Sequence, residues 1–215
     1  VNILVSYADN ALGRAKEAGK NRVEYFSSED YNKTLSRIEL QQEMRDSIQN
    51  NFEGFELYYQ PQVTSNEYKL HGAEALLRYR SRKFGFMSPV VFIPILEQSG
   101  MIVPVGKWVM QQAFSQCARW RKLQEDFSIS INASYVQLRE ASIVNDVVEA
   151  AREAGLPGRN ITVEVTESMQ LQDYNYFNNI FSNWRNKEIH VSIDDFGTGY
   201  SSLSYLKGLE VDEVK

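Results

Sequence analysis

The sequence predicts an α/β fold with a mostly parallel sheet. From Phe55 onward, apolar runs of strand length alternate with segments of helical spacing. This alternation is typical of βα units, whose strands pair in parallel. The chain has 215 residues, of which 43% are hydrophobic and 24% charged, and this composition indicates a globular protein with a sizeable core.

The elements follow in order along the chain. A helix is predicted from Tyr7 to Ala18, a short strand from Arg22 to Phe26, and a long helix from Glu29 to Asn50. Later strands are predicted at Phe55–Val63, Leu70–Leu77, Phe127–Asn132, Ile161–Thr166 and Ile189–Asp194, and another opens at Val211. The helices between them are predicted at Pro89–Gln98, Pro104–Leu123, Ala141–Glu153 and Tyr174–Asn186.

Charge and residue usage exclude several classes of function. A net charge of −5 argues against a broad DNA-binding or RNA-binding surface. A single cysteine, Cys117, allows no internal disulfide and fits the reducing cytosol. With His71 and His190 as the other soft ligands, a zinc cluster is not expected. We therefore expect a cytoplasmic protein, which regions outside this chain could still anchor to a membrane.

Polar side chains recur within or at the ends of the predicted strands. Glu74 lies in one strand, Asn132 ends the next, Glu164 and Glu167 lie in or after a third, and a fourth ends in Asp194-Asp195. In a βα barrel the carboxyl ends of the strands converge on one mouth. Carboxylates there are costly to bury without a partner, and oxygen ligands favour Mg²⁺, Mn²⁺ or Ca²⁺.

The pattern suits two cations. One is expected to be held by four residues, Glu74, Asn132, Glu164 and Asp194, and the second by Asp195. Two metals ~3.5–4 Å apart are the usual arrangement for activating water against a phosphodiester.

Each of these residues also has a purely structural interpretation. Asp195 could be a turn residue, Asp194 could be an N-cap-like group, and Asn132 could be a loop or cap residue. Glu164 could lie on an exposed edge strand, and Glu167 could be a capping group. Together these readings need five independent coincidences at strand ends, so the metal site is favoured. The tripeptide Asp195-Phe196-Gly197 does not indicate a protein kinase, because no glycine-rich phosphate loop or catalytic-loop motif precedes it.

Seven motifs occur here in the order of a known family. They are YYQPQV, GAEALLRY, FIPILEQSGMI, SINAS, VEVTES, SIDDFGTGYSSLSYL and VDEVK, between about Phe55 and Lys215. The chain thus resembles the EAL domain family of cyclic di-GMP phosphodiesterases. The segment YADNALGRAKEAGKNRV resembles the end of a GGDEF diguanylate cyclase domain. We expect a GGDEF remnant over 1–28, a connector helix over 29–50 and an EAL domain over 51–215, truncated at its C-terminus.

The resemblance implies a TIM-type (β/α)8 barrel with one reversed strand. It also implies hydrolysis of cyclic di-GMP to linear pGpG with Mg²⁺ or Mn²⁺, and a homodimer formed through EAL domains. By motif match, Lys215 would orient or activate the attacking water, and Glu167 would anchor the loop that follows Asp195. Gln60, Leu76 and Arg78 match positions that contact the dinucleotide, and a guanidinium suits a phosphate.

The sequence departs from the family after Arg78. The family usually continues Trp-x-His-Pro-x-x-Gly, whereas residues 79–85 read YRSRKFG. By the resemblance, this difference bears on the local loop and on the guanine contacts, and it leaves the metal ligands unaffected. Two alternatives to an active phosphodiesterase stay open: an EAL module that binds cyclic di-GMP without turnover, and a scaffold that binds no nucleotide.

Overall fold

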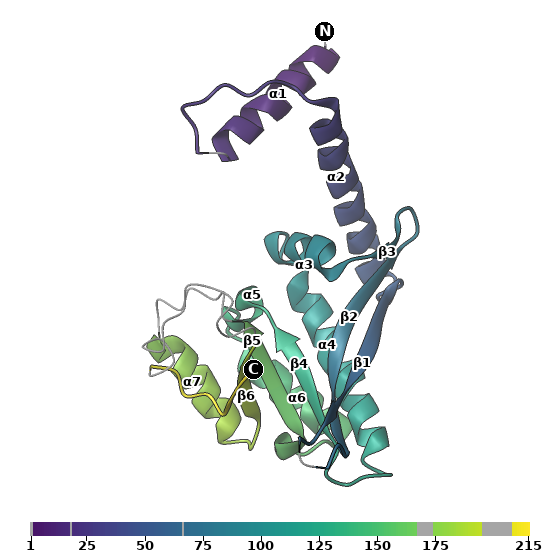
Figure 1. Cartoon of the computed structure of the whole chain (residues 1–215), viewed down its shortest axis with the longest axis vertical. Coiled ribbons are helices and arrows are strands. Elements are labelled where there is room, and N and C mark those ends of the chain that lie inside the picture. The colour runs from purple at the N-terminus through teal and green to yellow at the C-terminus, as the bar shows by residue number, and fades with distance from the viewer. Residues whose placement is uncertain (1, 18, 66, 167–173, 195–207) are drawn as a thin grey trace. The chain divides into compact units, whose positions relative to one another are not determined.

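The computed structural model describes residues 2–17, 19–65, 67–166, 174–194 and 208–215. By contacts, the chain divides into two compact units, Val1–Asp46 and Ser47–Lys215. Helix α1 (Asn2–Glu17) lies in the first unit, and helix α2 (Ser28–Gln49) begins there (Figure 1).

The strand predicted from Arg22 to Phe26 is wrong. These residues have no regular secondary structure, although Tyr25 and Val23 favour strands. A strand needs a partner to pair its backbone groups, and no strand of the described chain pairs with this segment. The segment instead returns along α1, where the Phe26 ring stacks on Tyr7 with centroids 3.9 Å apart.

The second unit is built on one mixed sheet with the order β1-β2-β4-β5-β6-β7, and β3 pairs with β2. Its strands are β1 (Phe55–Val63), β2 (Leu70–Ser81), β3 (Gly85–Met87), β4 (Ser128–Ala133), β5 (Ile161–Thr166), β6 (His190–Asp194) and β7 (Glu213–Val214). Strand β1 runs antiparallel to β2, and the strands from β2 through β7 along this order pair in parallel. The short strand β3 also runs antiparallel to β2. The predicted mostly parallel sheet is confirmed, and β1 is the reversed strand in the main strand order.

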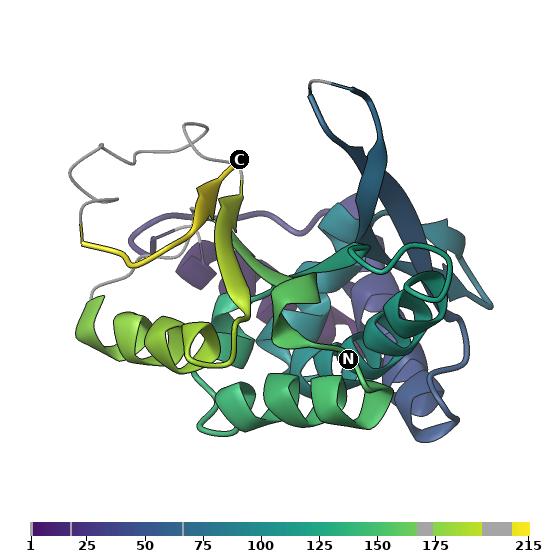
Figure 2. The same cartoon turned by 90° about the horizontal axis from the view of Figure 1, so that it is seen from below.

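Helices connect the parallel strands. They are α3 (Pro89–Gln98), α4 (Ile102–Trp120), α5 (Tyr135–Leu138), α6 (Ile143–Ala154) and α7 (Tyr174–Arg185), with a 3-10 turn at Gly158–Asn160. Pro89 fits the start of α3 because its missing N–H needs no partner there. Gly155, with φ of 64°, ends α6 in the left-handed conformation that glycine adopts without strain. Figures 1 and 2 show α4 and α6 along one side of the sheet.

The alternation of side chains along each strand divides the sheet into an apolar and a polar face. Ile129 and Ile131 of β4 and Val163 of β5 are buried on the side that the helices cover. Each such side chain contributes roughly 1.5–3 kcal/mol when it is removed from water. Residues of opposite parity are polar, such as Asn132 and Glu164. The packing that forms the core therefore directs the polar residues to the other face.

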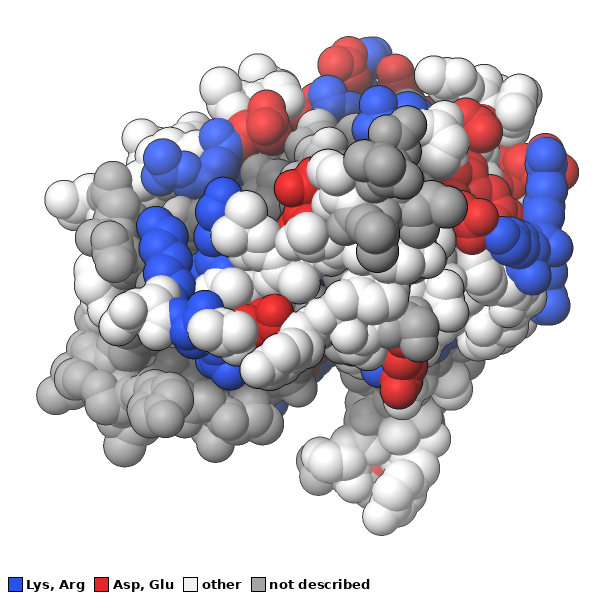
Figure 3. Space-filling model, turned by 90° about the horizontal axis from the view of Figure 1, so that it is seen from above, with Lys and Arg blue, Asp and Glu red and all other residues white. Residues whose placement is uncertain are grey.

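The length and composition of the helices, and the distribution of charge on the surface, bear on function. Within the described residues, no single helix is long and apolar enough to span a bilayer, and α3 with α4 meets that length and composition only as a pair bent by 120°. On the face shown in Figure 3, acidic and basic side chains lie among one another.

Candidate functional site

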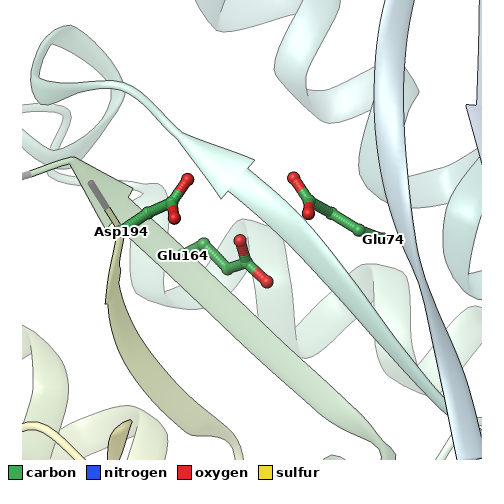
Figure 4. Close-up of side chains that lie close together, drawn as sticks. All are labelled: Glu74, Glu164 and Asp194. Carbon is green, nitrogen blue, oxygen red and sulfur yellow. The ribbon is translucent and has the colours of Figure 1, made fainter. Parts of the chain in front are cut away.

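Three carboxylates from three strands meet on the polar face of the sheet. Glu74 comes from β2, Glu164 from β5 and Asp194 from β6, and each offers an oxygen within 4.8 Å of the others (Figure 4). Glu164 is fully buried and the other two are half-buried. Three negative groups this close repel one another unless a cation lies between them. We call these three residues the acidic cluster.

Asn132 joins the acidic cluster through its amide. It lies opposite Glu164 in the β4–β5 register, and its Nδ2 donates a hydrogen bond of 2.8 Å to Glu74 Oε1. The structure thus brings together four of the five residues predicted to hold metal. Asp195, the fifth, and Glu167 lie outside the described residues.

Burial dominates the electrostatics of Glu164. Burial raises the pKa of its carboxyl group, the negative charge of Glu74 adds to the rise, and Lys215 opposes it. Lys215 Nζ forms an ion pair with Glu164 Oε1, while Glu164 Oε2 has no hydrogen-bond partner among the described residues. A buried carboxylate oxygen without a partner is costly. The donor set of carboxylates and one amide, without histidine or cysteine, therefore fits a hard divalent cation.

The last described segment holds Lys215 at the acidic cluster. Backbone hydrogen bonds run from Asp212 N to Val191 O (2.9 Å) and from Lys215 N to Ile193 O (2.8 Å), so the segment extends the sheet beside β6. Arg185 of α7 forms ion pairs with two residues of the same segment, Glu210 at 3.2 Å and Asp212 at 3.4 Å. The position of Lys215 thus depends on contacts made far from the acidic cluster.

A capping box shapes the chain after Asn132. The Ser134 side chain accepts a hydrogen bond from Gln137 N, and Gln137 Oε1 accepts one from Ser134 N, so β4 turns at once into the short helix α5. The Gln137 side chain fills the space beside Gly106, where an added Cβ would lie 2.0 Å from Gln137 Nε2. The sequence analysis missed this motif, although the spacing S-x-x-Q signals it.

A pocket of about 360 Å³ adjoins the acidic cluster. Its polar side is formed by Glu74, Asn132 and Asp194, and its apolar side by α3 and α4 residues such as Ile93 and Val105. Glu97 also lines it, and burial raises the pKa of that carboxyl group. The pocket is therefore an apolar cleft with acidic groups at the sheet, a form common among small-molecule sites.

The predicted dinucleotide contacts lie beside this pocket. Leu76 and Arg78 line it, and Gln60 of β1 is paired with Glu74 and exposed. Arg78 Nη1 donates to the carbonyl of Leu77 at 2.9 Å.

The sequence analysis missed two polar residues, Gln62 and Ser130, on the same face of the sheet as the acidic cluster. Ser130 is buried in β4, two residues before Asn132, and accepts a 3.2 Å hydrogen bond from Gln62 Nε2. The period-2 alternation of a strand, applied backward from Asn132, would have indicated Ser130.

Comparison with known proteins decides the family. The model of the EAL domain matches residues 41–215. The chain belongs to the EAL domain family. The resemblance seen in the seven motifs is thereby confirmed.

Curated relatives match along almost the whole chain. The signaling protein YkoW of Bacillus subtilis is 35% identical over 212 residues, which are 99% of this chain and 26% of the relative. The oxygen sensor protein DosP of Escherichia coli is 36% identical over 214 residues, with 99% and 26% covered. The bifunctional diguanylate cyclase/cyclic di-GMP phosphodiesterase MucR of Pseudomonas aeruginosa is 34% identical over 213 residues, with 99% and 31% covered. The EAL chain thus spans about a quarter to a third of the length of these relatives.

Solved EAL structures confirm the TIM-type barrel. The MucR phosphodiesterase in complex with c-di-GMP superposes with a TM-score of 0.75 at 34% identity, covering 82% of this chain and 71% of that one. The EAL enzyme Bd1971, bound to cAMP and cyclic di-GMP, gives 0.76 at 30% identity, with 99% and 55% covered.

Proposed function

We propose that this EAL domain is a metal-dependent phosphodiesterase that hydrolyses cyclic di-GMP to linear pGpG. The observation that carries the proposal is the acidic cluster, in which one oxygen from each of three carboxylates lies within 4.8 Å of the other two, beside a pocket. Relatives support the substrate, because MucR and PdeR of Escherichia coli carry cyclic di-GMP phosphodiesterase in their names.

The residues divide into metal ligands and a counter-ion. Glu74, Asn132, Glu164 and Asp194 would hold one Mg²⁺ or Mn²⁺, and Asp195, outside the described residues, would hold a second. A bound pair of such ions activates water and offsets charge on the phosphodiester. Until a cation enters, the Lys215 ammonium neutralises Glu164. With Glu164 as a ligand of the cation, this ammonium would be available to orient the attacking water.

The remaining predicted residues would orient the substrate. Arg78 offers paired N–H donors to a phosphate, and Leu76 and Gln60 lie on the same face of the sheet next to Glu74. Glu167 would anchor the loop after Asp195. We further propose that residues 1–28 are the end of a GGDEF domain, that 29–50 connect the two domains, and that EAL domains pair as homodimers.

The test is a hydrolysis assay on the intact protein. Cyclic di-GMP is incubated with Mg²⁺ or Mn²⁺, and the products are separated by chromatography, with nucleotide binding measured in parallel. The wild type is expected to form pGpG and Glu74→Ala to form none. The matched control, Glu149→Ala, removes an exposed carboxylate that pairs with Arg152 on α6 and is expected to be fully active. Binding by the wild type without turnover would contradict the proposal and indicate a receptor, and absence of both would indicate a scaffold.

A further inference from the structure

A row of aromatic and arginine residues extends from the acidic cluster along the same face of the sheet. In the β1–β2 register, Gln60 pairs with Glu74 and Tyr58 with Leu76. Because side chains alternate along a strand, Tyr58, Arg78 and Arg80 share the face of Glu74. Phe86 of β3 pairs with Arg80 and so joins them. Tyr58 is two residues from the Gln60–Glu74 pair, a distance of about 7 Å along the strand.

The aromatic rings in this row are large, apolar and open to solvent. Tyr58 is 47% exposed and Phe86 is 50% exposed, and their ring centroids are 6.3 Å apart. Neither ring belongs to the core, which lies on the other face of the sheet, where Tyr79 is fully buried against Phe55. Packing of the fold therefore does not account for two half-exposed aromatic rings at this place.

An arginine guanidinium lies over each of the two rings. Arg78 Cζ lies 5.6 Å from the Tyr58 centroid, and Arg80 Cζ lies 5.7 Å from the Phe86 centroid. Arg80 also contacts Glu56 at 3.5 Å, which limits its range of conformations. Arg78 lines the same pocket as Glu74 and Asp194, and Arg80 lies two residues further along β2, in a chain whose net charge is −5. An anionic ligand approaching the cluster would meet these cations on the same face.

We infer that Tyr58, Phe86 and Arg80, which we call the aromatic–arginine patch, bind a purine base of a nucleotide whose phosphate lies at the acidic cluster. An exposed ring offers a stacking surface for a planar base, and a guanidinium donates to the acceptor edge of guanine. This inference rests on the proposed function for the identity of the nucleotide. Two of the three patch residues, Arg80 and Phe86, lie within or directly after Tyr79–Gly85, the segment in which the sequence departs from the family pattern. The inference therefore assigns a base contact to this part of the chain.

The first test uses the kinetics of cyclic di-GMP hydrolysis by the intact protein. Phe86→Ala and Tyr58→Ala are each expected to raise KM about ten-fold, because base stacking on an aromatic ring typically contributes an effect of this order. The value of kcat is expected to stay within two-fold, because neither ring reaches the acidic cluster. Phe86→Trp and Tyr58→Phe preserve a stacking ring and are expected to keep the wild-type KM. Tyr68→Ala removes an aromatic ring that is 80% exposed outside the patch and serves as the matched control.

The second test does not depend on turnover. A cyclic dinucleotide in which one guanine is replaced by 2-aminopurine is titrated with protein, because stacking quenches the fluorescence of this base. Quenching by the wild type that is lost in Phe86→Ala and kept in Tyr68→Ala would support the patch. If this pattern appeared without any hydrolysis, the proposed function alone would fail. Normal hydrolysis with unchanged KM and unchanged quenching in both alanine variants would overturn the patch and leave the proposed function standing. Absence of both hydrolysis and quenching in the wild type would overturn both.

Discussion

Lys215 and Glu164 form an ion pair within the acidic cluster, although 51 positions separate them in the sequence. Glu164 is fully buried, and the Lys215 side chain is 31% exposed. The ammonium therefore occupies the role that a divalent cation would take: it neutralises a buried carboxylate, one oxygen of which has no hydrogen-bond partner in the part of the chain that the structure describes. A metal ion at the acidic cluster would therefore compete with Lys215 for the same negative charge.

This competition predicts how Lys215→Met behaves. Without metal the variant leaves Glu164 buried and unpaired, so its melting temperature is expected to fall below that of the wild type. Mn²⁺ replaces the lost cation, so the rise in melting temperature on adding Mn²⁺ is expected to be larger than in the wild type. Turnover is expected to fall about 100-fold or more. Differential scanning fluorimetry and the hydrolysis assay check these values, and an Mn²⁺ effect equal to that of the wild type would refute the competition.

Asn132 is predicted to contribute to metal affinity by ligation and by holding Glu74. Asn132→Ala removes the 2.8 Å hydrogen bond to Glu74 Oε1 and is expected to weaken Mn²⁺ binding at least ten-fold. Calorimetric titration measures this change. Asn183→Ala is the matched control, because that amide bonds only to Asn179 one turn away on α7 among the described residues. Equal losses in the two variants would point to a general defect and contradict the specific role.

Arg185 is predicted to act on turnover through the position of Lys215. Its contacts with Glu210 and Asp212 are partly exposed, so Arg185→Ala is expected to cost about 1 kcal/mol or less in free energy of unfolding. Turnover is nevertheless expected to fall several-fold, with Mn²⁺ affinity unchanged, because the metal ligands lie on other strands. Denaturant unfolding and kcat are compared with Arg152→Ala, which breaks the exposed pair with Glu149. Full activity of Arg185→Ala would show that β6 alone positions Lys215.

Cys117 is predicted to be inert in the folded protein. Burial raises the pKa of its thiol to about 12, so at pH 8 roughly one molecule in ten thousand carries the thiolate that alkylating reagents need. Iodoacetamide is therefore expected to leave native protein unmodified at pH 8 and to label it in guanidinium chloride, as mass spectrometry would detect. Raising the pH toward 12 increases the thiolate fraction and should accelerate labelling for as long as the fold survives. Rapid native labelling at pH 8 would contradict the buried position.

Strands and carboxylates were predictable here because local patterns encode them. The runs Phe55–Val63 and Ile161–Thr166 were predicted with the observed bounds, since β-branched and aromatic residues cluster there between turn residues. Glu74, Glu164 and Asp194 were predicted to meet because parallel strands bring their polar residues to one region of the sheet.

Other features depend on contacts between distant residues, which local patterns do not encode. The pairing of Lys215 with Glu164 requires the register of β7 on β6, and the three-residue strand β3 is recognisable only by its pairing with β2. The wrong strand at Arg22–Phe26 has the opposite cause: its residues favour a strand locally but find no partner in the described chain. The helix α5 was missed because four residues give no helical period.

The central claim is that the acidic cluster holds a divalent cation, and a calorimetric titration of metal-free protein with Mn²⁺ tests it most directly. The wild type is expected to bind Mn²⁺, and Glu164→Gln, which removes the charge and keeps the shape, is expected to lose that binding by ten-fold or more. Glu149→Gln, an exposed carboxylate of α6, is expected to bind as the wild type does. Undiminished Mn²⁺ affinity in Glu164→Gln would contradict the claim.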